Sequence, residues 1–194
     1  GRDSAREVLL TAFKEATAGR RQFVVIAGEP GIGKSRLSRE AVATMYETGA
    51  VVLAGRCEEH LGGPFQLWIG VLAHLIAHMP DEVIADHVAT HGSEIVKVVP
   101  DVRQRFPGID FPPRPAADFE RHRLFEAIAA LLIAATADGP LVVVLDDLQW
   151  ADDASLDWLQ QLMTTDDLPL TLVMGARPTL LERRPGWGDA LPRH

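Results

Sequence analysis

The most constraining feature of the sequence is a glycine-rich octapeptide at residues 28–35, Gly-Glu-Pro-Gly-Ile-Gly-Lys-Ser, which has the form G-x-x-x-x-G-K-[ST]. An apolar run at 23–27 precedes it, and the spacing of apolar residues after it is typical of an amphipathic helix. Strand, glycine loop and helix therefore occur in the order that a phosphate-binding loop requires. This order predicts that the chain binds a nucleoside triphosphate.

Each residue type in the octapeptide suits that task. Glycines adopt positive φ angles and let phosphate approach the backbone closely, and the N-terminus of the following helix favours an anion. We expect the Lys34 amine to reach the β- and γ-phosphates and the Ser35 hydroxyl to bind Mg²⁺. The residues predicted to contact ATP or ADP are Gly28, Glu29, Pro30, Gly31, Ile32, Gly33, Lys34, Ser35 and Arg36.

The order of apolar runs predicts an α/β fold. After the first strand, further strands are predicted at 50–55, 141–145 and 170–176, with helical patterns between them. Strands that alternate with helices form a parallel sheet covered by helices. Residues 64–137 are predicted to be a largely helical segment between the second and third strands, with separate helices over 81–90 and 93–105 and a break or kink at Pro100.

Charged residues follow the predicted strands, and ligands of open parallel sheets bind at the carboxyl ends of the strands. Asp146 is predicted to hold Mg²⁺ together with Ser35, and Asp147 is a candidate general base. Arg177 is a candidate contact for the γ-phosphate, and Arg56 is a weaker candidate for a nucleotide or interface role. The alternatives are that the Asp-Asp pair only forms a turn and helix cap, and that each arginine is an ordinary surface residue.

Composition narrows the class of protein. The formal net charge of −8 argues against a broad basic surface, so direct nucleic-acid binding by this segment is not expected. The single cysteine, Cys57, excludes an internal disulfide and is predicted to be a buried or half-buried thiol. The uninterrupted apolar runs are too short to cross a bilayer, and no leader peptide is evident, so we predict a cytoplasmic protein with no membrane partner.

Several stretches carry a resemblance to a known family. The segment LVVVLDDLQWADDASLDW at 141–158 resembles the Walker B region of the STAND class of signal-transduction ATPases, most closely the ATPase module of large ATP-binding LuxR-type transcriptional regulators and of related modules attached to bacterial adenylate cyclases. The stretches GRD, GEPGIGKSRL, GRCEEH and RHRLFEAI occur in the same order as in that family.

The resemblance implies a P-loop NTPase of the ASCE or AAA-like type, a three-layer sandwich whose fifth strand and lid would lie outside residues 1–194. It implies a switch that is closed with ADP and that opens and self-associates with ATP and an inducer or partner protein. By the same likeness, Arg177 matches the sensor-1 position, and Gly1 and Arg2 would lie near the adenine. Residues 1–194 would then be the ATPase core of a longer protein.

The leading hypothesis is a Mg²⁺-dependent regulatory ATPase that turns over slowly, because Asp147 stands where many P-loop ATPases have the longer glutamate. Lys34, Asp147 and Arg177 are the predicted catalytic residues. The alternative is a non-catalytic scaffold that uses nucleotide only for stability and binds a partner. A P-loop kinase acting on a small acceptor is a third possibility, which the Asp-Asp-Leu-Gln-Trp context disfavours.

Overall fold

A computed structural model describes residues 2–59, 65–108, 120–164 and 170–188 of the chain. Four strands form one sheet, in which every pairing is parallel. The strands are β1 (Gln22–Ala27), β2 (Val51–Arg56), β3 (Leu141–Asp146) and β4 (Leu170–Ala176), in the spatial order β1-β4-β3-β2. The predicted α/β class and parallel sheet are therefore confirmed.

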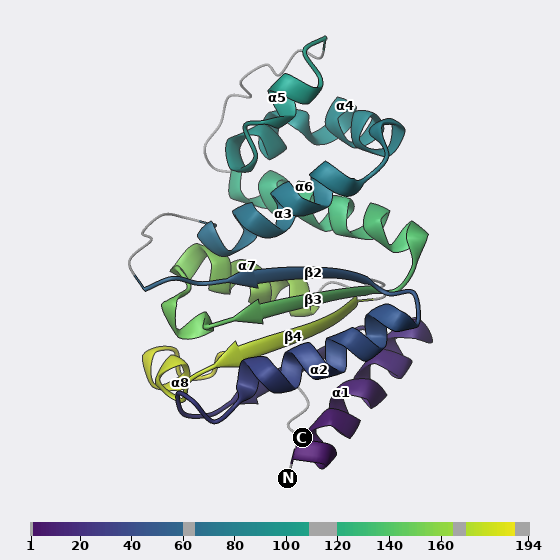
Figure 1. The fold of residues 1–194 in the computed structure, drawn as a ribbon. Coiled ribbons are helices and arrows are strands. Elements are labelled where there is room, and N and C mark those ends of the chain that lie inside the picture. Colours follow the sequence, from purple (N-terminus) through teal and green to yellow (C-terminus); the bar gives the residue numbers. More distant parts are fainter. Residues whose placement is uncertain (1, 60–64, 109–119, 165–169, 189–194) are drawn as a thin grey trace.

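Helices cover both faces of this sheet, so the predicted three-layer arrangement is confirmed as well (Figure 1). One face is covered by α1 (Arg2–Thr17) and α2 (Lys34–Glu47). The other face is covered by α3 (Gln66–His78), α6 (Glu120–Ala135) and α7 (Asp153–Thr164). Two further helices, α4 (Asp81–Val98) and α5 (Val102–Arg105), lie outside this layer, with α4 packed on α6.

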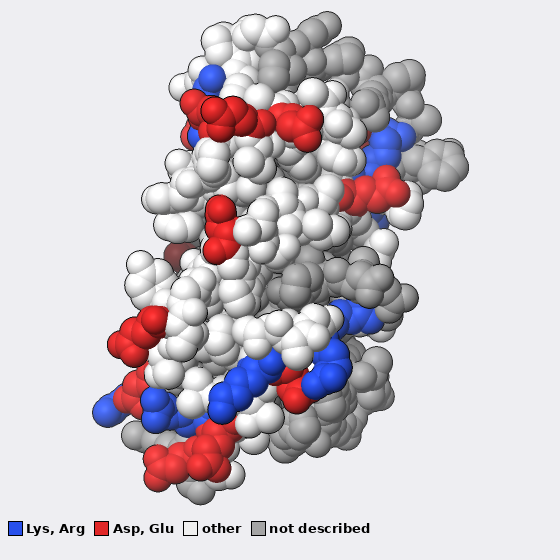
Figure 2. All heavy atoms as spheres, turned by 90° about the vertical axis from the view of Figure 1, so that its right-hand side faces the viewer, with Lys and Arg blue, Asp and Glu red and all other residues white. Residues whose placement is uncertain are grey.

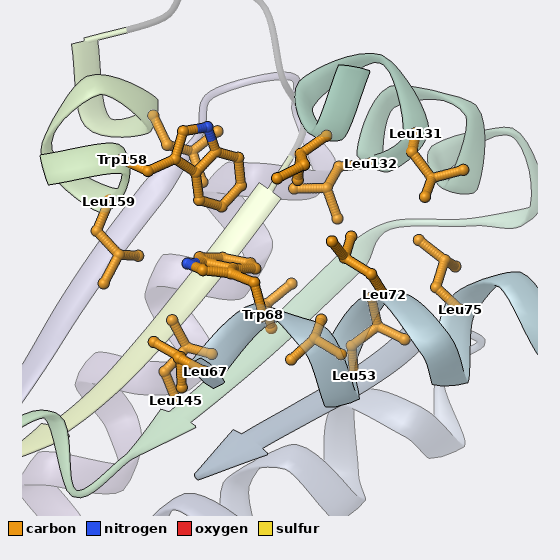
Figure 3. Close-up of a cluster of buried hydrophobic side chains, with 14 of the residues drawn as sticks. Leu53, Leu67, Trp68, Leu72, Leu75, Leu131, Leu132, Leu145, Trp158 and Leu159 are labelled. Atoms are coloured by element: carbon orange, nitrogen blue, oxygen red, sulfur yellow. The ribbon is translucent and has the colours of Figure 1, made fainter. Parts of the chain in front are cut away.

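The central strands are the continuous apolar runs of the sequence. Every residue of β4 is buried, and β3 is buried at four of its six positions, as expected for strands covered on both faces. The larger core lies between the sheet and α3, α6 and α7. At its centre the rings of Trp68 and Trp158 meet edge to face with centroids 4.0 Å apart, and Leu53 and Leu145 belong to the same buried cluster on the sheet side (Figure 3).

One helix differs from its prediction. The two weak helices expected at 81–90 and 93–105 are instead the single helix α4, and only the short α5 follows Pro100. Gly92 does not interrupt α4, because Ile84, Val88 and Ile95 form one continuous buried stripe that holds the helix against the core. Helical structure otherwise extends through the described parts of the predicted helical segment, ending in the 3₁₀ turn η2 (Thr136–Asp138).

An ion pair joins the outer helix to the layer beneath it. Nε of Arg123 on α6 donates to Oε1 of Glu94 on α4 at 3.2 Å, and the Glu94 side chain is only 2% exposed. A carboxylate this deeply buried needs a cation beside it, so Arg123 compensates its charge. The pair therefore anchors α4 on α6.

Shortly after β4 lies an element that the sequence did not predict, the short helix α8 (Thr179–Arg183). The sequence also predicts a loop at 107–115, which contains four prolines, and a helix cap at Asp118. Residues 109–119, which include most of that loop and Asp118, lie outside the described residues, as do 189–194. Among the described residues, no helix is both long enough and apolar enough to cross a membrane.

The four strands end on the same side of the molecule, the left side of Figure 1, where the loops leading to α2, α7 and α8 also lie. Figure 2 shows the opposite side, where acidic and basic side chains lie next to one another over the lower part of the face. The expected absence of nucleic-acid binding remains a prediction.

Candidate nucleotide-binding site

The glycine loop joins the end of β1 to the start of α2. Gly31 and Gly33 have φ angles of 80° and 102°, which side chains with a Cβ rarely adopt. Gly28 has no such angle; its N–H donates to the carbonyl of Ala176 at 3.2 Å and ties the loop to the end of β4. The backbone therefore forms a turn directly before the N-terminus of a 14-residue helix, an arrangement suited to phosphate.

Lys34 is the first residue of α2, and its side chain folds back over the loop. Its Nζ donates to the carbonyl oxygens of Gly28 at 2.7 Å and Glu29 at 3.1 Å. An ammonium group held by two carbonyls of the loop lies where a phosphate bound by the same loop would meet it. The geometry thus fits the predicted role of Lys34.

Ser35 and Asp146, 111 residues apart in the sequence, are in direct contact. The Ser35 hydroxyl donates to Oδ2 of Asp146 at 2.5 Å, while Oδ1 of Asp146 accepts the N–H of Asp147 at 2.9 Å. A hydroxyl beside a carboxylate is a pair of hard oxygen ligands of the kind that Mg²⁺ prefers, so these two side chains could hold that ion. The pair predicted to bind Mg²⁺ is therefore brought together.

Asp147 has a strained backbone and a well-anchored side chain. Its φ of 58° lies in the left-handed region, where non-glycine residues are uncommon and often mark functional sites. Oδ1 accepts from Nε2 of Gln149 at 3.0 Å, and Oδ2 accepts from Nε of Arg56 at 2.9 Å. These hydrogen bonds to the carboxylate help to hold the strained backbone conformation of Asp147.

The same contacts set the charge of Asp147. Partial burial acts to raise its pKa, but the hydrogen bonds from Gln149 and Arg56 and the charges of Arg56 and Arg177 outweigh it, so the pKa is lowered. The carboxylate is ionised at neutral pH and is a weak base while both partners are bound. Arg56, whose side chain is 72% exposed, is the partner that solvent reaches most easily.

Arg177 follows β4 and is held from two sides. Its backbone N–H donates to Oε1 of Gln149 at 3.1 Å, and its guanidinium carbon lies 5.6 Å from the centre of the Trp150 ring, within range of a cation–π contact. Its charge contributes to the lowered pKa of Asp147. The candidate γ-phosphate contact thus lies at the same strand edge as the candidate base.

Two neighbouring residues behave as structural groups. Asp152, which the sequence favours as a helix cap rather than a metal ligand, caps α7: Oδ1 accepts the Ser155 N–H at 2.9 Å, and Oδ2 accepts the Ser155 hydroxyl at 2.6 Å. Cys57 is buried as predicted, and burial, followed by the charges of Asp152, Asp147 and Asp146, raises the pKa of its thiol to about 12. Such a thiol is unreactive at neutral pH.

Other predicted contacts lie further from this cluster. The guanidinium of Arg36 pairs with Glu40 one turn along α2, at 2.7 Å. Ile32 at the loop tip is 62% exposed, and Glu29 and Pro30 are exposed too. Gly1 and the side chain of Arg2 lie outside the described residues, so their expected place near the adenine stays a prediction.

Three residues that matter here were not identified from the sequence: Gly175, Gln149 and Arg183. A glycine inside an apolar strand is a known signal of close approach, and a Cβ at Gly175 would lie 2.4 Å from Oδ1 of Asp146. No sequence signal pointed to Gln149 or Arg183, because their contacts join segments that only the fold brings together.

Comparison with known proteins agrees with this geometry. Residues 1–174 match the family described as the AAA ATPase domain, and the chain belongs to this family. A stretch of 169 residues is 23% identical to hybrid signal transduction histidine kinase G of Dictyostelium discoideum. That match covers 81% of this chain and 5% of the kinase, so the chain spans only a small part of this relative's length.

Proposed function

We propose that the chain is an ATP-binding, slowly hydrolysing, Mg²⁺-dependent switch domain of a bacterial signalling or transcriptional regulator. The contact between Ser35 and Asp146 carries the proposal, since it joins the glycine loop to the carboxylate that follows β3. Membership of the AAA ATPase family supports nucleotide binding and ATPase chemistry in general. The finer role as a switch rests on the resemblance of the Asp-Asp-Leu-Gln-Trp region to STAND ATPases and on the signalling relative.

Each residue has a distinct task in this proposal. The backbone of Gly31 and Gly33 and the amine of Lys34 bind the phosphates, and Ser35 and Asp146 hold Mg²⁺. When bound, Mg²⁺ neutralises charge on the phosphate oxygens. Asp147 orients the attacking water and accepts its proton, and Arg177 contacts the γ-phosphate. We further propose that residues 1–194 are the ATPase core of a longer protein.

Calorimetric titration with ATP and Mg²⁺ tests the binding step. The 194-residue chain is expected to bind, Lys34→Ala is expected to lose binding, and Lys14→Ala, at an exposed lysine of α1, is the matched control. Asp147→Ala is expected to keep binding but to release no phosphate. Absence of binding by the folded wild-type chain would refute the proposal.

One observation favours a second candidate, a scaffold that binds nucleotide without hydrolysing it. Both oxygens of Asp147 are engaged and its pKa is lowered, which weakens it as a base. Single-turnover phosphate release separates the two: release that depends on Asp147 excludes the scaffold. Binding with no release over many hours would favour it.

A further inference from the structure

Gln149 connects the ends of two neighbouring strands through its side chain. It lies in the 3₁₀ turn η3 (Leu148–Trp150) and is 5% exposed. Its Nε2 donates to Oδ1 of Asp147 at 3.0 Å, and its Oε1 accepts the backbone N–H of Arg177 at 3.1 Å. One amide therefore joins the carboxylate after β3 to the first residue after β4.

Few side chains satisfy both partners. An ionised carboxylate only accepts hydrogen bonds and a backbone N–H only donates, so the group between them must carry a donor and an acceptor. These partners also determine the orientation of the amide, since the reverse assignment would point NH₂ at an N–H and oxygen at a carboxylate. A glutamate would lose the first bond, and an apolar residue would lose both.

The backbone of η3, the turn that carries Gln149, is held by hydrogen bonds from another segment of the chain. Arg183 of α8 donates from Nη1 to the carbonyl of Gln149 at 2.9 Å and from Nη2 to that of Ala151 at 2.8 Å. Trp150 meanwhile contacts the Arg177 guanidinium with its ring. These contacts order the backbone of η3 before any ligand binds, as is required of a group that orients another.

We infer that Gln149 is a positioning residue, which fixes the Asp147 carboxylate and links it to the strand end that bears Arg177. The inference rests on the proposed hydrolysis. Gln149 is buried and occupies Oδ1, whereas the partner of Oδ2 is the exposed Arg56. Oδ2 is consequently the oxygen that becomes available to water when Arg56 moves away, and Gln149 determines its direction.

Hydrogen exchange of the Arg177 backbone N–H separates the two contacts of Gln149, because this N–H is bonded to the Gln149 side-chain oxygen. Gln149→Met removes the donor with little change of volume, and Gln149→Glu keeps the acceptor for Arg177 but loses the bond to Asp147. Gln149→Met is expected to expose the Arg177 N–H to exchange, whereas Gln149→Glu is expected to keep it protected, because only the glutamate retains an acceptor for it. Gln160→Met, at an exposed glutamine of α7, is the control and is expected to leave this exchange unchanged.

Hydrolysis by the same variants tests the positioning role. Gln149→Met is expected to lower kcat about tenfold with an unchanged affinity for ATP, the loss typical of a hydrogen bond to a charged group. Gln149→Glu is expected to show a similar loss of kcat although it keeps the contact with Arg177, which a merely structural link between the strand ends would not cause.

Contrary outcomes separate this inference from the proposed function. An unchanged kcat in both folded variants, or a fall in kcat in Gln149→Met that Gln149→Glu does not share, overturns the positioning role alone. If the wild-type chain binds ATP but releases no phosphate, the proposed hydrolysis fails and the positioning role fails with it.

Discussion

Gly175 and Asp146 lie against each other across neighbouring strands: a Cβ added to Gly175 would lie 2.4 Å from Oδ1 of Asp146. The carboxylate that contacts Ser35 thus occupies space left free by the missing side chain on β4. No ordinary residue fits there unless Asp146 moves. The position of the Asp146 carboxylate in the proposed Mg²⁺ site therefore depends on Gly175, a strand residue that contributes no ligand.

We expect Gly175→Ala to displace the Asp146 side chain and to weaken Mg²⁺-dependent ATP binding by about 10- to 100-fold, as for loss of a residue that supports a metal ligand. Calorimetry measures the effect, and circular dichroism checks the fold. Gly70→Ala on α3 is the matched control, because a Cβ there meets nothing within 4 Å. Equal affinity of Gly175→Ala and wild type would show that Asp146 is not needed in its present position.

Arg56→Ala is expected to raise the pKa of Asp147. The substitution removes both a hydrogen bond and a positive charge that favour the ionised carboxylate. Burial, which raises the pKa, is then opposed by fewer interactions. Carboxyl NMR titration of Asp147 measures the shift. Arg20→Ala, which removes a similarly exposed partner of Glu15 near the end of α1, is expected to leave this titration unchanged. A pKa of Asp147 that does not rise would mean that Gln149 and the charge of Arg177 are enough to hold the carboxylate ionised.

How far the site could be foreseen differs from residue to residue. Ser35 and Asp146 were predictable as partners, because a glycine loop and an apolar run ending in aspartate place both at one edge of a parallel sheet. The bond from Arg177 to Gln149 was not predictable, since it depends on how β3 and β4 lie side by side.

The predicted helical segment at 64–137 was likewise only partly predictable from the sequence. Its helical character follows from local periodicity, but the continuity of α4 through Gly92 does not. Local propensity favours a break at a glycine, and burial of the neighbouring apolar residues against the core overrides it. The ion pair of Glu94 with Arg123 likewise depends on the packing of α4 on α6.

Arg123→Ala is expected to destabilise the fold by about 3 kcal/mol or more, because it leaves the buried Glu94 carboxylate without its cation. Urea denaturation measures the change in the free energy of unfolding. Arg121→Ala, at an exposed arginine two residues earlier on α6, is expected to change it by less than about 1 kcal/mol. Similar losses in the two variants would mean that Glu94 tolerates burial without Arg123.

His87 is expected to make the fold sensitive to mild acid. Burial, followed by the charge of His91, lowers its pKa from an ordinary 6.5 to about 4 in the folded protein. The folded state therefore binds fewer protons than the unfolded chain between these values. The stability contributed by neutral His87 is complete above pH 6.5 and is lost as the pH falls toward 4.

Between pH 7 and pH 5 the wild-type chain should lose about 2 kcal/mol through this group. Urea denaturation at the two pH values measures the loss. His87→Leu keeps an apolar contact at the buried position and is expected to lose correspondingly less on acidification. His78→Leu, at an exposed position of α3, controls for the substitution and is expected to follow the wild type. If His87→Leu and the wild type respond equally to pH, another group causes the acid sensitivity and His87 is protonated in the folded state near its ordinary pKa.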